Sequence, residues 1–144
     1  MTPEERAQRC ADAMWATDDA SQALGMRIEN VGPGTATLTM QVRKHMLNGH
    51  GICHGGMIFT LADSAFAFAC NSYNRLTVAQ SNQITYLAPG QLDEVLTATA
   101  TEVAREGRSG TYDVTVTGAD TRQIALFRGL SREISGTHFE ENTE

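Results

Sequence analysis

The sequence predicts an α+β fold in which an antiparallel sheet wraps around one long central helix, with a further helix at the N-terminus. The central helix is expected at 55–73, where an apolar run has almost no charged face and so must be surrounded by protein. Four strand-like segments follow at 76–87, 95–103, 111–117 and 123–134, separated by turn residues. Their short connections favour an antiparallel meander.

The N-terminal half supplies the remaining elements in order. Residues 3–20 are expected to form an amphipathic helix, because a proline stands at its start and two glutamates follow in its first turn. A strand is expected at 26–31, and a Gly-Pro-Gly turn separates it from 35–42, where strict alternation indicates a half-buried strand. Residues 43–54 form a loop rich in glycine and histidine that leads into the central helix.

Length and charge limit the classes of function. The 144 residues are expected to form one domain over 1–134, followed by a polar, acidic and frayed tail over 135–144. The net charge of −6 argues against a nucleic-acid partner, since such proteins carry a basic stripe. No apolar run approaches the roughly 20 residues of a membrane span.

Cysteine content and the N-terminal residues point to the cytoplasm. Cys10, Cys53 and Cys70 are odd in number and widely spaced, which is unlike a disulfide framework and fits a reducing compartment. The first residues are polar and acidic, unlike a secretory or transit signal.

The run from His54 to Ser64 (HGGMIFTLADS) carries the strongest chemical signal in the chain. Free glycine N–H groups at Gly55, where the helix begins, would form an anion site. Asp63 lies in the middle of the apolar helix, and a buried carboxylate is costly unless it has a partner or a task. An oxyanion-stabilising end together with a nucleophile or base is sufficient to hydrolyse an activated acyl group.

The spacing of these two residues predicts an oligomer. Eight residues of helix separate Gly55 from Asp63 by about 12 Å, so the two cannot act on one carbonyl within one chain. If two copies of the helix lie antiparallel across a two-fold axis, each glycine comes level with the other chain's aspartate. We therefore expect at least a dimer with composite sites.

Other chemistries fit the sequence less well. His45, His50, Cys53 and His54 crowd one loop, but their spacing matches no standard zinc pattern. Cys53 as an acyl nucleophile lacks an evident activating group. The chain has no Gly-x-Ser-x-Gly elbow, and its glycines do not form a Gly-x-Gly-x-x-Gly motif after a strand.

The combination of 48–56 (NGHGICHGG), Leu-Ala-Asp-Ser at 61–64 and this sheet pattern resembles the hotdog-fold thioesterases, and more narrowly their phenylacetic acid degradation (PaaI) branch. The resemblance continues through 13–16, 63–72 and 82–87. It implies a dimer whose two sheets join, with dimers pairing into a homotetramer. It also implies hydrolysis of acyl-coenzyme A thioesters, with no metal and no bound cofactor.

The resemblance assigns roles to individual residues. Asp63 matches the family's catalytic carboxylate, and Gly55 matches the amide that polarises the thioester carbonyl. Asn48 and His54 match polar residues on the glycine side of the site, although His54 could instead bond only to backbone. Whether Asp63 attacks the thioester or activates water stays open.

Candidate substrate-binding residues are less certain in role. In related enzymes a hydroxyl on the strand after the helix helps place the water, and here Thr77, Ser81 or neither takes that role. Gly56 is a possible second donor, although close packing explains it equally well. Four further residues are candidates for substrate contact. Phe66, one turn from the aspartate, would touch the acyl group. Arg105 and Arg108, followed by Arg128, would meet the coenzyme A phosphates.

The resemblance points to aryl-acyl substrates, namely phenylacetyl-coenzyme A and its ring-hydroxylated forms. The expected reaction releases free acid and coenzyme A in phenylacetate degradation. Two alternatives are a hotdog acyl-coenzyme A hydratase or dehydratase and a non-catalytic acyl-coenzyme A-binding protein. Release of a free thiol separates hydrolysis from both.

Overall fold

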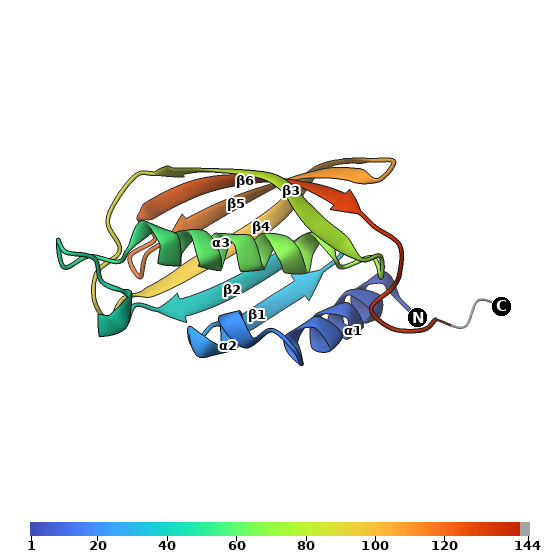
Figure 1. Ribbon diagram of the computed structural model, residues 1–144, viewed down its shortest axis with the longest axis horizontal. Helices are drawn as coiled ribbons and strands as arrows, with labels where there is room; N and C mark the ends of the chain where they lie inside the picture. The colour runs from blue at the N-terminus through green and yellow to red at the C-terminus, as the bar shows by residue number, and fades with distance from the viewer. Residues whose placement is uncertain (142–144) are drawn as a thin grey trace.

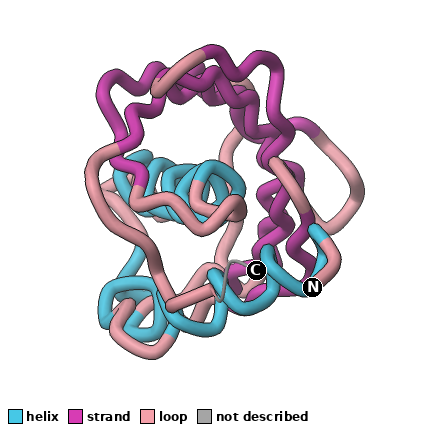
Figure 2. Tube along the Cα trace, turned by 90° about the vertical axis from the view of Figure 1, so that its right-hand side faces the viewer, coloured by secondary structure: helices cyan, strands magenta, loops and turns pink. Residues whose placement is uncertain are grey.

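The computed structural model describes residues 1–141, in which one six-stranded antiparallel sheet curls around helix α3 (Figures 1 and 2). The predicted fold class is confirmed. The elements in chain order are α1 (Pro3–Trp15), α2 (Asp19–Ala23), β1 (Arg27–Gly32), β2 (Thr35–Gln41), the 3-10 turn η1 (Lys44–Met46), α3 (Gly55–Cys70), β3 (Thr77–Tyr86), β4 (Val95–Glu106), β5 (Ser109–Thr117) and β6 (Gln123–Glu133).

The strand order is β1-β2-β4-β5-β6-β3, so the expected meander is only partly correct. β4, β5 and β6 follow one another as neighbours, but β3 lies beyond β6 at the far edge. The connection after β3 crosses the end of the sheet: the Leu87 N–H donates to the Ile124 carbonyl, and the Asp93 N–H donates to the Val42 carbonyl. These bonds tie the crossing segment to strands on both sides.

The predicted N-terminal helix is in fact two helices. α1 ends at Trp15 and α2 begins at Asp19. The cause is Asp18, whose carboxylate accepts a hydrogen bond from the Ser21 N–H at 3.0 Å and so caps a new helix. The Ser21 and Ser64 hydroxyl oxygens lie 2.9 Å apart, which fixes α2 against α3.

The core lies between α3 and the inner face of the sheet. Phe66 is almost fully buried there, with its ring 5.7 Å from that of Tyr112 and 5.9 Å from that of Phe127. Gly129 makes room for this ring, because a Cβ at that position would lie 2.6 Å from a Phe66 carbon.

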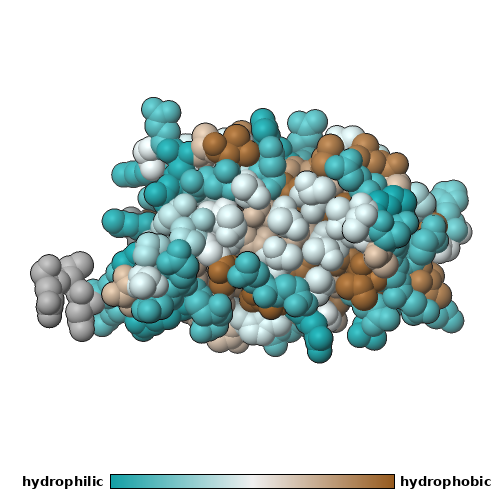
Figure 3. All heavy atoms as spheres, turned by 180° about the vertical axis from the view of Figure 1, so that it is seen from behind, coloured by the Kyte–Doolittle hydropathy of each residue, from teal (hydrophilic) through white to brown (hydrophobic). Residues whose placement is uncertain are grey.

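The outer face of the sheet shows a broad area of intermediate hydropathy with separate apolar patches (Figure 3). Alternation along the strands places threonines of β2, β4 and β5 on this face. Leu126 and Leu130 of β6 are exposed there, and Arg128 between them pairs with Asp113 at 2.6 Å.

The C-terminal residues pack on the body of the molecule instead of fraying, as far as they are described. Glu141 pairs with Arg6 of α1 at 2.7 Å, and the Asn74 side chain donates to the Phe139 carbonyl. Residues 142–144 of the expected tail lie outside the described residues. No helix within residues 1–141 is long and apolar enough to cross a membrane. All three cysteines are free and buried.

Candidate active site

The N-terminus of α3 presents one unused backbone donor. His54 is the N-cap of this helix, and its Nδ1 accepts the Gly56 N–H at 2.9 Å. Nδ1 must therefore be unprotonated, and the Gly56 donor is already occupied. The Gly55 N–H has no hydrogen-bond acceptor within the described part of the chain. Of the two predicted glycine donors, only Gly55 is available to a ligand.

Tyr86 of β3 covers this glycine. Its hydroxyl donates to the Gly55 carbonyl oxygen at 2.8 Å. A Cβ on Gly55 would lie 3.0 Å from Tyr86 Cζ, so a larger residue would press on the ring. The sequence analysis did not find Tyr86, because nothing in the local pattern shows which strand residue reaches the helix start.

The loop before α3 is held by Asn48. The Asn48 Oδ1 accepts the His50 N–H at 2.9 Å and the Ile52 N–H at 3.3 Å. Asn48 therefore orders the loop beside a hollow of about 450 Å³ next to Gly55. Its lining includes Asn48, Ile52, Gly55, Ile58, Tyr86 and Leu87.

The loop cysteine and histidines do not form a second reactive centre. Burial raises the pKa of Cys53 to about 11, which keeps the thiol protonated near neutral pH. Across residues 1–141, no group of three or more His, Cys, Asp or Glu side chains is placed to hold a metal ion.

Asp63 lies half-buried in the third turn of α3 and has one side-chain partner. The Asn82 side chain on β3 donates from Nδ2 to Asp63 Oδ1 at 3.0 Å. Burial raises the pKa of Asp63, and the Asn82 hydrogen bond offsets part of this effect. A carboxylate with a raised pKa is a stronger base once ionised.

A β-bulge decides which residue of β3 reaches Asp63. Ala79 pairs with Ser131 and Ser81 with Leu130, so Gln80 is an extra residue on this strand. After the bulge, Asn82 pairs with Gly129 on the inner face, whereas Ser81 faces outward with exposed Leu130. The expectation that Ser81 contributes a hydroxyl to the site is therefore wrong, because regular alternation does not hold across the bulge.

Thr77, the other hydroxyl candidate, is also misplaced for this role. Its Oγ1 donates to the Arg75 carbonyl at 2.8 Å. Thr77 lies five strand residues before Asn82, or about 16 Å along β3.

β3 holds both ends of the candidate site at a matched spacing. Asp63 and Gly55 are eight helical residues apart, about 12 Å, and Asn82 and Tyr86 are four strand residues apart, about 13 Å. The strand therefore contacts the carboxylate and the glycine at the same time.

The remaining predicted residues divide into two groups. Phe66 is part of the core, so the expectation that it touches the acyl group is wrong: packing with Tyr112 and Phe127 occupies its ring. Arg105 and Arg108 lie beyond the C-terminal end of α3, where the Arg105 guanidinium stacks 3.5 Å from the Tyr73 ring centroid.

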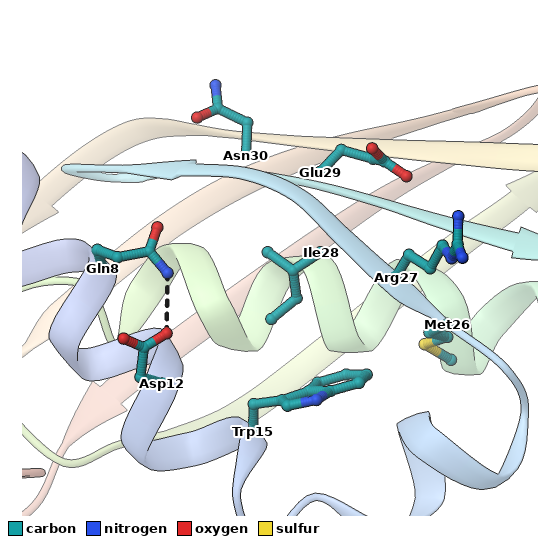
Figure 4. Close-up of a pocket in the computed structure, with 8 residues that line it drawn as sticks. All are labelled: Gln8, Asp12, Trp15, Met26, Arg27, Ile28, Glu29 and Asn30. Atoms are coloured by element: carbon teal, nitrogen blue, oxygen red, sulfur yellow. Dashed lines mark hydrogen bonds between the residues drawn. The ribbon is translucent and has the colours of Figure 1, made fainter.

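A separate hollow of about 570 Å³ lies between α1 and β1 (Figure 4). Ile28 points from β1 toward the helices, and Gln8 donates to Asp12 at 2.9 Å beside it. None of the predicted site residues lines this hollow, so it does not belong to the candidate site.

The sequence and the fold of this chain are similar to those of known proteins. The thioesterase superfamily model matches residues 50–125. The chain is 44% identical to the acyl-coenzyme A thioesterase PaaI of Escherichia coli K12 over 133 residues, which cover 92% of this chain and 94% of the relative. The structure of the E. coli PaaI protein from the phenylacetic acid degradation operon superposes with a TM-score of 0.93 at 42% identity, covering 94% of this chain and 99% of that one. A hypothetical thioesterase of Streptococcus pneumoniae, solved with coenzyme A, superposes with a TM-score of 0.78 at 28% identity. The match covers 88% of this chain and 97% of that one.

Proposed function

This chain belongs to the thioesterase superfamily and is an acyl-coenzyme A thioesterase, and we propose that its substrates are aryl-acyl-coenzyme A thioesters, phenylacetyl-coenzyme A and hydroxyphenylacetyl-coenzyme A above all. In this proposal Asp63 is the nucleophile or general base, and the Gly55 N–H stabilises the oxyanion. The reaction releases free acid and coenzyme A in phenylacetate degradation. Asn48 and His54 hold the glycine end in shape through the loop bonds and the helix cap.

The observation that carries the proposal is the unused Gly55 N–H, about 12 Å from a half-buried carboxylate on the same helix. An unpaired donor at a helix start favours developing negative charge, and loss of such a donor typically costs about 10²–10³ in turnover. The separation requires that the two groups acting on one carbonyl come from different chains.

The sheet supports a specific dimer. β3 is an edge strand: within residues 1–141 it pairs with β6 on one side, and no strand pairs with its other side. We propose that two copies of β3 pair antiparallel about a two-fold axis beside Ile84. In this register Asn82 lies opposite the partner's Tyr86, and Asp63 comes level with the partner's Gly55. Each dimer then has two composite sites, and two dimers form the proposed homotetramer.

The surroundings of the glycine support an aryl substrate. Ile52, Ile58 and Leu87 line the hollow beside Gly55, and the Tyr86 ring forms another wall. Apolar and aromatic side chains of this kind suit a ring such as that of phenylacetate. The similarity to PaaI of E. coli supports the same substrate class.

Coenzyme A also needs cations to meet its phosphates. We propose that Arg105 and Arg108 serve this purpose, because they lie beyond the end of α3, about 10 Å past Asp63 along the helix axis. Arg128 is excluded from this role because Asp113 already pairs with it on the outer face. The three free cysteines fit the cytoplasmic location that we propose.

The test is thiol release from phenylacetyl-, benzoyl-, short-chain and medium-chain acyl-coenzyme A by the wild type and Asp63→Asn. We expect the highest kcat/KM with phenylacetyl-coenzyme A and a loss of about 10²–10⁴-fold in the variant. Folding and oligomeric state are checked for both proteins. A preference for medium-chain substrates would overturn the aryl assignment, and an active, folded Asp63→Asn would overturn the role of the carboxylate.

A further inference from the structure

One polar atom of the Asn82 side chain makes a hydrogen bond, and the other is buried without a partner among the described residues. Its Nδ2 donates to Asp63 Oδ1 at 3.0 Å. Its Oδ1 is, within residues 1–141, the one buried side-chain nitrogen or oxygen without a hydrogen-bond partner. Buried polar atoms are paired in nearly all cases, so an orphaned acceptor beside a functional carboxylate indicates a missing donor.

We propose that this donor is the water that attacks the thioester, held between Asn82 Oδ1 and the Asp63 carboxylate. The proposal rests on the proposed function and deepens it by assigning Asp63 the role of general base. It also assigns water placement to an amide on β3, whereas the sequence left open whether the hydroxyl of Thr77, that of Ser81 or neither has this role.

The geometry permits such a water. The nitrogen and oxygen of an amide are about 2.3 Å apart, so Asn82 Oδ1 lies no more than about 5.3 Å from Asp63 Oδ1. A water that donates one hydrogen bond of about 2.8 Å to each oxygen spans about 4.4 Å, because its two O–H bonds are about 105° apart. One water bonds to both side chains when the two oxygens lie within about that distance, which is inside the range that the Asn82–Asp63 hydrogen bond allows.

Asp63 and Asn82 would have different roles toward this water. Asp63 removes one proton from the water as its oxygen attacks the thioester carbonyl carbon, and the carbonyl oxygen becomes the oxyanion bound by the partner's Gly55 N–H. The carbon–sulfur bond then breaks, the proton on Asp63 passes to the departing thiolate, and the products are free acid and coenzyme A thiol. Asn82 accepts the water's other hydrogen throughout and exchanges no proton, since an amide oxygen is too weak a base.

Asn82 also affects the charge state of the base. Its Nδ2 hydrogen bond lowers the pKa of Asp63, against the effect of burial. Within residues 1–141, Cys70, farther along α3, is a titratable group whose pKa the charge of Asp63 influences. Burial raises the pKa of this thiol to about 12, so it stays neutral while Asp63 titrates.

The first experiment compares the variants Asn82→Leu and Gln83→Leu. Gln83 carries the neighbouring amide of β3 and faces outward opposite Arg128. We expect Asn82→Leu to lower kcat about 10²-fold with little change in KM, since a misplaced reactant costs about this much, and Gln83→Leu to match the wild type. Equal kcat in the two variants would overturn the inference. A loss in Ser81→Ala larger than that in Asn82→Leu would also overturn it, because the hydroxyl would then hold the water.

The second experiment uses Asn82→Asp, because aspartate has nearly the same shape as asparagine. This variant keeps the inference testable if the leucine variant does not fold. Two carboxylates sharing one site raise each other's pKa, so the acidic limb of the kcat profile should move to higher pH. A lower kcat with an unmoved limb would show that the side chain at position 82 does not act on the Asp63 carboxylate, and this result would overturn the inference.

The third experiment follows oxygen from H₂¹⁸O in a single turnover with excess wild-type enzyme. We expect the label in the released acid and none in Asp63 by peptide mass spectrometry. Label in Asp63 would reveal a mixed anhydride formed by direct attack, which would overturn the assignment of the water to Asn82 and Asp63. Failure of the wild type to hydrolyse any thioester would instead reject the proposed function itself.

Discussion

The two ends of α3 are built in opposite ways. At the N-terminal end the Gly55 N–H has no partner within the described residues. At the C-terminal end Asn71 pairs every polar atom it has: Nδ2 donates to the Ala67 and Thr77 carbonyls, while Oδ1 accepts the Thr77 N–H and contacts His138 Nε2 at 2.8 Å.

This difference separates function from stability along a single helix. Satisfied polar groups at the C-terminal end fix the helix to β3 and to the C-terminal segment, and the Asn71 side chain has no polar atom left for the reacting carbonyl. The unsatisfied donor at the N-terminal end costs stability, and this cost is recovered when a developing oxyanion binds. Mutations at the two ends should therefore change different quantities.

The largest expected effect is on catalysis, from Gly55→Pro compared with Gly55→Ala. Both substitutions place a Cβ 3.0 Å from the Tyr86 ring, but only proline removes the N–H. Proline suits the first position of a helix, and His54 already has an extended backbone with ψ of 135°. We expect kcat for thiol release to be about 10²–10³-fold lower in the proline variant than in the alanine variant.

Mixed oligomers sharpen this test. Gly55→Pro and Asp63→Asn chains are each inactive alone, but one site of each mixed dimer combines an intact Asp63 with an intact Gly55 from the other chain. An equal mixture that exchanges subunits should recover about a quarter of the wild-type activity. No recovery in a mixture shown to contain hybrids would place both groups in one chain.

The next effect is on stability, from Asn71→Ala. Removing this side chain takes the Oδ1 acceptor from the Thr77 N–H and the Nδ2 donor from the Thr77 carbonyl, beside a buried residue. We expect the free energy of unfolding in urea to fall by about 1–3 kcal/mol, with kcat within twofold of wild type. A comparable fall in kcat with stability unchanged would show that the C-terminal end takes part in the chemistry.

The two ends should also respond differently to acid. Burial raises the pKa of Asp63 above the ordinary carboxyl value, so activity should fall as pH decreases through that raised value, while protonation there stabilises the fold. Burial lowers the pKa of His138, so its contribution to stability is present above the ordinary value of 6.5 and is lost as pH falls below it.

Urea unfolding of the wild type, Asp63→Asn and His138→Leu at several pH values separates these contributions. The stability advantage of Asp63→Asn over wild type should grow as pH rises through the folded pKa of Asp63. The loss of stability of wild type between pH 7 and pH 5 should shrink in His138→Leu. An unchanged slope in that variant would assign the acid sensitivity to other groups.

The smallest effect is expected from Arg105→Gln. If Arg105 meets a coenzyme A phosphate, KM should rise a few-fold at low salt and less at high salt, with kcat unchanged. An acyl-pantetheine thioester lacks the nucleotide phosphates and should show no such change. Arg128→Gln serves as the control, and a KM effect as large as that of Arg105→Gln would show that the effect is not local.

Much of the fold follows from sequence patterns, and the failures have physical causes. An apolar run without a charged face identifies α3, and strand-like segments between turn residues, with strict alternation at 35–42, identify the strands. The position of β3 beyond β6 depends on non-local pairing that no local pattern records. The division of the first helix depends on one capping side chain, that of Asp18.

The candidate site was predictable on the helix and not on the strand. Asp63 and Gly55 are conspicuous in sequence, since a carboxylate in an apolar helix and paired glycines at its start are unusual. Asn82 and Tyr86 look like ordinary strand residues, and only the bulge at Gln80 shows that Asn82 faces inward. Assignments based on regular alternation fail at such a bulge.

The same bulge has a consequence for how this chain can change in length. Deleting Gln80 would remove the extra residue and restore regular pairing, while Asn82 and Tyr86 keep their inward orientation. Deleting any one residue between Asn82 and Tyr86 would turn one of them outward and separate β3 from either Asp63 or Gly55. Among related sequences, insertions and deletions are therefore expected before Ser81 and not within positions 82–86.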